Sequence, residues 1–364
     1  MAQTYAAQGL TPTQWDDDFF TDYVRASRFR RYMGTEEDSM IHLKEDLTKK
    51  KGDSVVFALV NELVGNGVTG NNTLKGNEER LNSRSQRVTV DVLRHAVAVD
   101  DWDVQKSVID LRMAAKSQLR QWAQTKLRDG IITGLGSMDG VAFASCTAAQ
   151  RNTWTTNNQD RVLFGRSTAA YTTTFAAGIS AISASDRCNP LTLSLMKRMA
   201  QAANPKIKPI YLRELDQEWY VAFLHSRAFR DLKELDPTTN AMNLANREAR
   251  VRGTDNPLFT GDSLVWDGII IREIPEIATL PGFSASAGTS IVPVYLCGAQ
   301  ALGIAWAQRT KSTTDVDDYE FLHGVGVQEI RGIEKLRFGT VPGQDTTTPK
   351  DHGIVTAYFS GPAD

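Results

Sequence analysis

A glycine-rich stretch is the part of the sequence whose residue spacing is closest to a known chemical motif. Residues Gly65-Asn66-Gly67-Val68-Thr69-Gly70 match the G-x-G-x-x-G pattern and follow a β-branched run. In a dinucleotide site this pattern opens a helix, whose N-terminus binds the pyrophosphate. Here Asn71-Asn72-Thr73-Leu74-Lys75-Gly76-Asn77 follows, and so polar a segment cannot start a packed helix. The residues therefore favour a flexible loop tip, and a nucleotide-binding enzyme using residues 65–70 is the alternative function.

Other side chains with chemical potential are scattered along the chain. The five histidines are isolated, and none has a metal-ligand spacing with another histidine or a cysteine. Asp315, Asp317, Asp318 and Glu320 form an acidic run, but it lacks the glycine and the distal glutamate of a calcium loop. A solvated face, or a contact with basic residues of a neighbour, is the favoured interpretation. The sequence thus assigns no catalytic residue, no metal ligand and no cofactor.

Length and composition place the chain among ordinary globular proteins. With 364 residues it exceeds the size at which one core usually stops growing, so two or more sub-domains are expected. The net charge of −2 gives no global basic field for nucleic acid. No apolar run has the length of a membrane span, and the N-terminus lacks the regions of a signal peptide. Cys146, Cys188 and Cys297 have no paired spacing, which predicts reduced, mostly buried thiols.

The stretch from Lys51 to Gly130 organises the rest of the chain. Residues 54–60 form an apolar, β-branched run, residues 65–80 a polar tip, and residues 87–92 alternate valine with polar side chains. This pattern predicts two strands joined by a long loop. An isolated two-stranded ribbon is marginal in water, and nothing nearby in the sequence covers its apolar faces. We therefore expect an arm that lies on another body, such as a second copy of the chain.

A long helix is predicted directly after the ribbon, over Val104–Arg128. Asp100, Asp101 and Asp103 suit the positive end of its dipole, and Gly130 suits a C-terminal cap. Apolar residues recur at spacings of three and four and predict one buried stripe; they are Val104, Val108, Leu111, Ala115, Leu119 and Trp122. A single stripe fits a helix that lies on a sheet.

A second helix is predicted near the N-terminus. Thr11, Pro12 and Gln14 have the pattern of a helix start, and Trp15, Phe19 and Tyr23 recur on one face. The basic residues of this region complement the helix dipole and face solvent, or contact a polyanion; they are Arg25, Arg28, Arg30 and Arg31.

The remaining residues predict an irregular mixture of elements. Residues 134–187 fit short strands and loops best, and a helix is expected to start at Asn189-Pro190 and to end at Asn204. Further helices are expected over 226–235 and 298–308, and a pair of strands over 319–338. The other expected strands are 208–212, 219–224, 264–266, 269–271, 291–296 and 354–359. Such a mixture predicts an α+β fold.

Several stretches resemble the major capsid proteins of tailed bacteriophages, in the branch typified by N4-like phages, which have the HK97-like fold. The resemblance covers residues 1–130 well and continues in the order of the later elements. It rests on the N-terminal helix with Trp15 and Phe19, Lys51-Gly52-Asp53 with the strand that follows, Gly65–Gly70, Leu74-Lys75-Gly76-Asn77-Glu78-Glu79-Arg80-Leu81, and Val88-Thr89-Val90-Asp91 leading through Arg94-His95-Ala96-Val97 into the long helix.

The resemblance implies a division of the chain into named parts. Residues 1–40 would be an N-terminal arm, and residues 41–100 an extended β-hairpin, the E-loop, which lies over the adjacent subunit. A peripheral (P) domain would take residues 101–205 and 311–340, with its spine helix at about 104–128. An axial (A) domain would take residues 206–310 and 341–364.

The function implied by the resemblance is structural, without catalysis. Copies of the chain would form hexamers and pentamers of an icosahedral shell around double-stranded phage DNA, assembled in the host bacterial cytoplasm, without a membrane and with decoration, scaffold and portal proteins as further partners. Expected inter-subunit contacts are Glu78, Glu79, Arg80, Arg84, Trp15 and Phe19. Residues expected near DNA on the inner face are Arg25, Arg28, Arg30 and Arg31.

Overall fold

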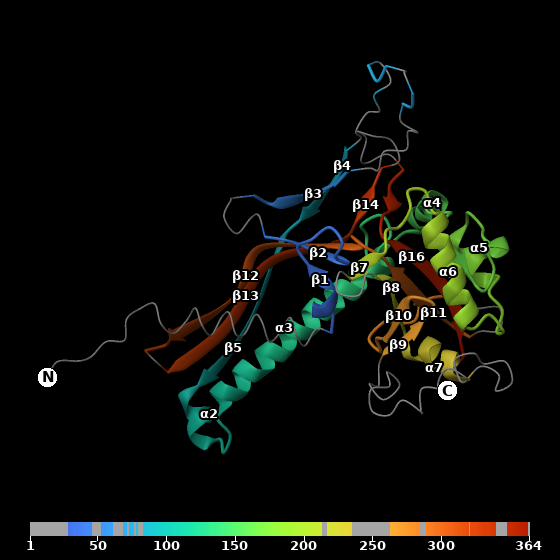
Figure 1. Ribbon diagram of the computed structural model, residues 1–364. Helices are drawn as coiled ribbons and strands as arrows, with labels where there is room; N and C mark the ends of the chain where they lie inside the picture. Colours follow the sequence, from blue (N-terminus) through green and yellow to red (C-terminus); the bar gives the residue numbers. More distant parts are fainter. Residues whose placement is uncertain are drawn as a thin grey trace, which may run out of the picture.

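In the described part of the chain, two large β-sheets share one long helix, and a two-stranded ribbon lies beside them (Figure 1). The structure is a computed structural model, and it describes residues 28–45, 52–60, 68–70, 73–75, 78, 83–212, 217–234, 263–283, 289–319, 321–339 and 348–362. The helix expected over residues 11–31 lies almost entirely outside these ranges. Its last residues form a 3-10 turn, η1 (Arg30–Tyr32), whose Tyr32 is buried.

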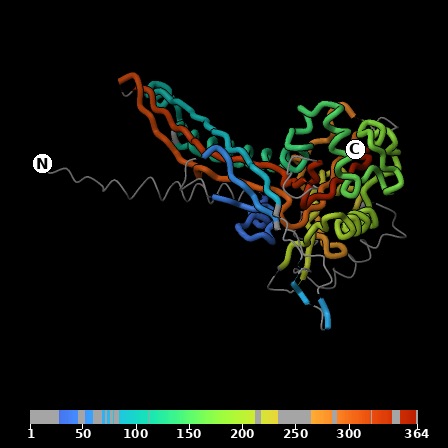
Figure 2. Tube along the Cα trace, turned by 90° about the horizontal axis from the view of Figure 1, so that it is seen from above, coloured from blue at the N-terminus to red at the C-terminus, as the bar shows by residue number. Residues whose placement is uncertain are grey.

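Three long antiparallel strands of the first sheet form an arm that projects from the rest of the molecule (Figures 1 and 2). They are β5 (Asp91–Asp100), β12 (Leu302–Asp317) and β13 (Leu322–Lys335). At the root of the arm, β2 (Ile41–Lys44) pairs in parallel with β12, and β1 (Met33–Gly34) pairs with β2. The sheet order is therefore β1-β2-β12-β13-β5.

Two helices follow β5 where one was predicted. The helix α2 (Asp101–Lys106) begins after Asp100, whose side chain accepts a hydrogen bond from the amide of Asp103 at 2.7 Å. The chain then leaves the helix, and Asp110 starts α3 (Leu111–Gly136) by accepting from the amide of Met113 at 3.1 Å. The predicted end at Gly130 is wrong, because α3 continues through it; a Cβ there would lie 3.1 Å from Ile333 Cδ1.

The buried face of α3 packs against both the arm and the second sheet. Its buried residues recur at every fourth position; they are Ala115, Leu119, Ala123, Leu127, Ile131 and Leu135. The predicted stripe is confirmed from Ala115 onward, whereas Val108 precedes the helix and is fully exposed. One core joins α3 to Ile304 and Val325 of the arm and to Phe223 and Tyr295 of the second sheet.

The second sheet has seven strands, with helices on its faces. Its order is β6-β16-β11-β8-β10-β9, and β7 pairs with the start of β8. The strands are β6 (Val162–Phe164), β7 (Ile210–Leu212), β8 (Gln217–Leu224), β9 (Ser263–Trp266), β10 (Ile269–Glu273), β11 (Ser290–Cys297) and β16 (Ile354–Gly361). The predictions for β7 to β11 and β16 are confirmed. The residues of β11 and β16 are nearly all buried, as expected of central strands covered on both faces.

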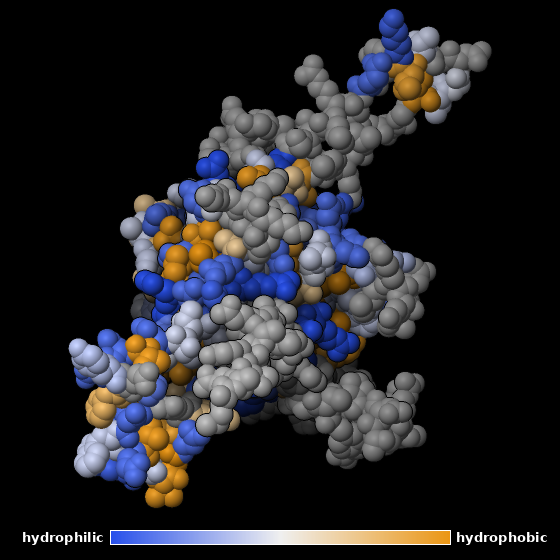
Figure 3. Space-filling view, turned by 90° about the vertical axis from the view of Figure 1, so that its left-hand side faces the viewer, coloured by the Kyte–Doolittle hydropathy of each residue, from blue (hydrophilic) through white to orange (hydrophobic). Residues whose placement is uncertain are grey.

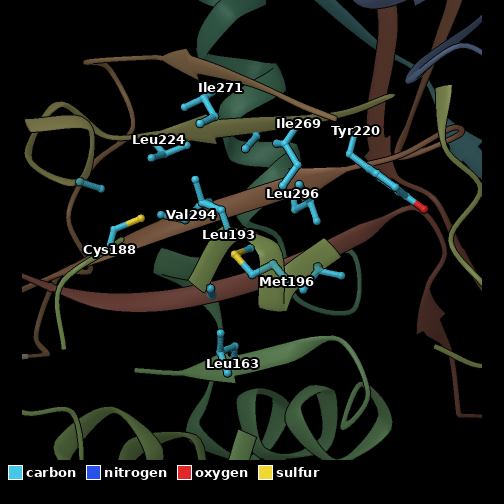
Figure 4. Close-up of a cluster of buried hydrophobic side chains, with 14 of the residues drawn as sticks. Leu163, Cys188, Leu193, Met196, Tyr220, Leu224, Ile269, Ile271, Val294 and Leu296 are labelled. Carbon is cyan, nitrogen blue, oxygen red and sulfur yellow. The ribbon is translucent and has the colours of Figure 1, made fainter. Parts of the chain in front are cut away.

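Helices α6 (Pro190–Ala202) and α7 (Ser226–Glu234) pack on one face of this sheet. Met196 of α6 lies against Val294 and Leu296 of β11 in the core shown in Figure 4. The start of α6 is fixed by a capping box between Asn189 and Thr192, with Pro190 in the first turn, and both predicted helices are confirmed.

Two helices that the sequence did not predict cover another part of the sheet. They are α4 (Ala148–Asn157) and α5 (Phe175–Ser180), and they pack with Phe164 and Tyr358. The expectation of strands and loops over 134–187 is therefore wrong in part. A signal was present, because Thr147 and Gln150 form a capping box. Short 3-10 turns, η3 (Phe143–Ser145) and η4 (Thr168–Ala170), complete this region.

The ribbon consists of β3 (Ser54–Val60) and β4 (Ser83–Thr89), paired antiparallel as predicted. The second predicted strand, 87–92, spans the end of β4 and the start of β5, so its alternation does not describe one strand. Beside the ribbon, β14 (Arg337–Phe338) pairs with β15 (Lys350–Asp351).

Two predictions late in the chain are wrong. Residues 298–308 do not form a helix; from Leu302 they belong to β12, whose first residues are buried on both faces. Residues 319–338 do not form a strand pair with each other, because β13 instead pairs with β12 and β5.

Candidate functional surfaces

The three cysteine thiols are buried and lie in separate core clusters. Cys146, Cys188 and Cys297 are free and buried, as predicted. Burial raises the pKa of Cys188 to about 12, so its thiol is hardly ionised near neutral pH. Within the described residues, no group of three His, Cys, Asp or Glu side chains is placed to hold a metal ion. No described helix is long and apolar enough to span a membrane.

The ribbon packs one of its faces on its own chain. Val55, Phe57, Leu59 and Val88 are buried in one cluster with side chains of β12, β14 and the residue between β13 and β14. The prediction that the ribbon finds no partner within its own chain is therefore wrong for this face. The partners, Ala305, Leu336 and Phe338, lie far later in the sequence, so local patterns do not reveal them.

The opposite face of the ribbon is open. Val56 is 48% exposed, and its cross-strand partner Arg87 is also exposed. Arg84, a predicted contact residue, pairs with the buried Leu59 and is half-buried. Its charge is close enough to contribute to the lowered pKa of His352. Arg84 therefore faces the body of its own subunit, whereas the Val56–Arg87 row faces outward.

The root of the ribbon is held by the side chain of Gln86, which is 9% exposed. Its Nε2 donates to the carbonyl oxygen of Lys335 at 3.1 Å, and its Oε1 accepts from the amide of Arg337 at 2.5 Å. Further along β4, the amide and the hydroxyl of Thr89 donate to Oε1 of Glu334 at 3.4 and 3.3 Å. The ribbon is thus bonded to the end of β13 at two successive points.

A buried polar cluster lies directly behind this root. Lys335 Nζ contacts Asp351 Oδ2 at 2.9 Å, and Trp154 Nε1 donates to the same oxygen at 3.1 Å. The guanidinium of Arg161 donates to the carbonyl of His352 at 2.8 Å and to that of Asp351. Burial, followed by the charge of Arg161, lowers the pKa of His352 to about 3, so this imidazole is neutral.

Asp139 lies in the tight turn after α3, at the edge of the same cluster. Burial and the like charge of Asp351 raise its pKa to about 6, against the opposing charges of Arg337 and Lys335. Its φ of 50° lies in the left-handed region, which Asp and Asn tolerate better than most residues. The turn therefore carries a carboxyl group that titrates in the mildly acidic range.

The far end of the arm carries exposed apolar side chains. We call these residues the arm-tip patch: Trp102, Val108, Ile109, Met113, Val316, Tyr319 and Phe321. They lie together because β5 pairs with the start of β13 and the amide of Asp101 donates to the carbonyl of Phe321 at 3.1 Å. In Figure 3 hydrophobic atoms gather at the lower end of the face, at the height of α2 in Figure 1. Val108 and Tyr319 are fully exposed.

Acidic residues surround the arm-tip patch. They are Asp100, Asp101, Asp103, Asp110, Asp315, Asp317 and Asp318. Lys106 stands among them, with its Nζ 4.3 Å from the ring centroid of Trp102. Isolated exposed apolar residues are normal, but an apolar group with a polar rim marks an interaction surface.

The other predicted contact residues are not gathered into one site. Glu78 is exposed, whereas Glu79 and Arg80 lie outside the described residues, as do Trp15, Phe19 and Arg25. Arg28, Arg30 and Arg31 are exposed around η1. Of the glycine motif, residues 68–70 are described as a loop, in which Gly70 has a φ of 73°.

Comparisons with known proteins agree on one class. Residues 4–362 match the family model described as phage capsid protein. The chain is 29% identical over 380 residues to the major capsid protein of Pseudomonas phage KPP25, covering 96% of this chain and 94% of that protein. It is similar to the structure titled "Cyanophage Pam1 capsid asymmetric unit", with a TM-score of 0.80, 34% identity and full coverage of both chains.

The fold extends to more distant proteins. The structure titled "Capsid of Ralstonia phage GP4" has a TM-score of 0.72 at 21% identity, covering 92% of this chain and 91% of that one. The predicted α+β, HK97-like phage capsid fold is confirmed. These matches give no support to a nucleotide-binding enzyme, and the N4-like branch stays a prediction. Because a family model spans nearly the whole sequence, this chain belongs to the phage capsid protein family.

Proposed function

We propose that this chain is a major capsid protein, whose copies assemble into the hexamers and pentamers of an icosahedral shell around phage DNA. The observation that carries the proposal is the similarity to the Pam1 capsid subunit, which runs the full length of both chains at 34% identity. The role is structural and involves no catalysis. We expect assembly in the host bacterial cytoplasm, with scaffold, decoration and portal proteins as further partners.

We propose that the parts of the fold take the roles of the capsid domains. The ribbon would be the E-loop, the arm with α3 the P domain, and the seven-stranded sheet the A domain. In this proposal three expected boundaries differ. The E-loop would end near Asp91, because β5 pairs along the arm, and the chain would re-enter the P domain at Leu302 and not at residue 311, because β12 is one strand. The A domain would also include β6, which was expected in the P domain.

The open face of the ribbon is a surface on which a neighbouring copy would lie. Its exposed Val56 and Arg87 offer apolar area and positive charge, and the exposed Glu78 adds a carboxylate near the tip. We expect Glu78, with Glu79, Arg80, Trp15 and Phe19, to contact other subunits. Arg84 would contribute less, because it faces its own chain.

A second contact would be made by the arm-tip patch, and its occupant would be another copy of this chain. A closed shell needs contacts in more than one direction, and the ribbon supplies only one of them. The tip is far from the ribbon along the arm, as Figure 1 shows, and it presents apolar area that no described residue covers.

Contact with DNA would be local. The chain carries a net charge of −2, so the protein as a whole does not attract DNA. Attraction to DNA would therefore come from a local basic patch on the inner face. We expect Arg28, Arg30 and Arg31, which are exposed around η1, and Arg25 to supply it.

Negative-stain microscopy of the purified chain tests the proposal. Rings or closed shells of uniform diameter are expected. A chain without residues 65–81 should remain soluble but fail to close shells, because the ribbon loses its tip. A protein that stays monomeric at high concentration, with and without scaffold, would refute the assembly role. Normal shells from the deletion would refute the role of the ribbon tip.

A further inference from the structure

Gln86 makes an unusual pair of contacts for a side chain in the middle of a strand. Its amide group offers two N–H donors and an acceptor oxygen. One donor and the acceptor bind the segment on either side of Leu336, through the carbonyl of Lys335 and the amide of Arg337, and Nε2 also lies 3.4 Å from Oε2 of Glu334. Gln86 therefore stands where a residue of a neighbouring strand would pair with this segment.

We propose that Gln86 is a positioning residue, which sets the angle at which the ribbon leaves its own subunit and so where it meets the next one. The inference rests on the proposed function, since the angle matters only if the ribbon lies over a neighbour. Gln86 would act through the direction of β3 and β4 and would not itself touch the other subunit.

Three contacts, together with the buried apolar side chains Val55 and Leu59, fix the direction of the ribbon. Gln86 and Thr89 bind the end of β13 at two points along β4, which define a line. The third lies on the other strand, where Phe57 packs against Gly303 of β12. A third point off the line prevents the ribbon from rolling about β4. Loss of the Gln86 point would leave the angle of β4 to Thr89 and to the apolar packing of the inner face, which is less directional than hydrogen bonding.

At Thr89 the backbone of β4 lies directly against the backbone of β13. A Cβ added at Gly332 would overlap the carbonyl oxygen of Thr89, so only glycine permits the two strands to lie this close. This contact is therefore backbone against backbone, with no long side chain to absorb a change of angle.

A small rotation of the ribbon at its root produces a large displacement at its far end. The seven residues of β3 span about 23 Å at about 3.3 Å per residue, so a tilt of about 10° moves the far end by about 4 Å. Hydrogen bonds tolerate displacements of only a few tenths of an ångström around 2.9 Å. A ribbon whose angle varied by this amount would not meet the same atoms of every neighbour.

The joint is also tied to the core of the subunit. The residue whose carbonyl binds Gln86 is Lys335, and its side chain ends on the buried Asp351 of β15. β15 leads within a few residues into β16 of the seven-stranded sheet. The ribbon is therefore attached, through Lys335 and Asp351, to the seven-stranded sheet and not to a surface loop.

The substitution Gln86→Met tests the proposal, because methionine keeps the length and volume of glutamine but forms neither hydrogen bond. Gln217→Met, at an exposed position at the start of β8, is the matched control. Thr89→Val, at an exposed site, removes one bond from the second point and serves as an independent variant should Gln86→Met fold poorly. Each variant is compared with the unaltered chain by thermal melting, by amide hydrogen exchange and by negative-stain microscopy of assembled particles.

For Gln86→Met we expect a modestly lowered melting temperature, because the carbonyl of Lys335 and the amide of Arg337 lose their partner, and we expect the amide of Arg337 to exchange on the order of five-fold faster. We expect its particles to lose their single diameter and to include open or irregular shells. Gln217→Met should behave like the unaltered chain in all three measurements.

Two results would overturn the positioning role. One is faster exchange at the root with particles of unchanged diameter, and the other is a lowered melting temperature with unchanged particles, which marks a merely structural residue. Failure of the unaltered chain to form particles would instead refute the proposed function. In that case the exchange rates still decide whether Gln86 fixes the root of the ribbon.

Discussion

The Nζ atom of Lys335 lies 2.9 Å from Oδ2 of Asp351, and neither side chain is more than 3% exposed. Trp154 donates to the same oxygen, and Asn158 accepts from the backbone amide of Asp351 at 2.8 Å. This pair joins β13, β15 and α4 at the root of the ribbon. A buried pair of this kind contributes uncertain net stability, but removal of one partner leaves a charge without compensation.

Lys335→Met should therefore lower the free energy of unfolding by about 3–5 kcal/mol, because the carboxylate of Asp351 would remain buried with only neutral donors. Urea denaturation of the unassembled subunit measures the change. Arg309→Met is the matched control: its pair with Glu45, at 2.8 Å, is exposed and should be worth less than about 1 kcal/mol. Equal, small losses in both variants would contradict the structural role of the buried pair.

Gly332→Ala should destabilise the subunit by about 1–3 kcal/mol or more, because the added methyl group would overlap the carbonyl oxygen of Thr89, which is backbone and cannot turn away. Gly324→Ala, in the same strand, meets its nearest atom only at 3.6 Å and should be tolerated. Thermal melting of the two variants compares them directly. If Gly332→Ala has the same melting temperature as Gly324→Ala, then β13 and β4 do not touch at Gly332 and Thr89 as described.

Asp139→Asn should stabilise the subunit at neutral pH. The pKa of Asp139 is raised from its ordinary value of 3.8 to about 6 in the folded chain, so the folded state binds its proton more tightly than the unfolded state does. The stability associated with this proton is present below about pH 4 and is lost as the pH rises through 6. Removing the charge should recover on the order of 1–3 kcal/mol at pH 7. Asparagine also accepts the positive φ of this turn.

The measurement compares melting temperatures of Asp139→Asn and the unaltered chain at about pH 4.5 and pH 7.5. The difference between the two proteins should be larger at the higher pH. His352 acts with the opposite sign, because its pKa is lowered to about 3 and protonation on acidification favours the unfolded state. It is present in both proteins and cancels in the comparison. An equal difference in melting temperature at both pH values would show that the titration of Asp139 does not contribute to the pH dependence of stability.

The double variant Val108→Ser, Ile109→Ser should leave the stability of the subunit nearly unchanged, since both side chains are largely exposed. Assembly should weaken, because the arm-tip patch loses apolar area that a second copy would bury. Light scattering and sedimentation of particles measure the effect. Val265→Ser, at an exposed site on the other sheet, should assemble normally. Unimpaired assembly of the double variant would remove the arm tip from the contacts of the shell.

Local sequence signals predicted those elements whose determinants are themselves local. The capping box at Asn189 and Thr192 fixed the start of α6, and the apolar run 291–296 gave β11. The failure at residues 298–308 has a physical cause. The first residues of β12 are buried on both faces, so they show neither the period of a strand nor that of a helix. The small residues of the segment 298–308 favoured the incorrect prediction of a helix.

The surfaces depended on contacts between residues distant in the sequence. Nothing in the neighbourhood of Gln86 indicates that it pairs with a segment near residue 336, or that Lys335 ends on Asp351. The ribbon was predicted correctly as a pair of strands, but its inner face is covered by Ala305 and Phe338, which no local pattern could identify. The apolar residues of the arm tip were mistaken in part for a helix stripe, since Val108 fits that spacing.

The helix α3 has a mechanical consequence. Its buried side chains run from Ala115 under the arm to Leu135 beside the seven-stranded sheet, without a break in its 26 residues. Because one apolar core encloses both ends of the helix, a displacement of the arm relative to α3 would also disturb the packing of the seven-stranded sheet.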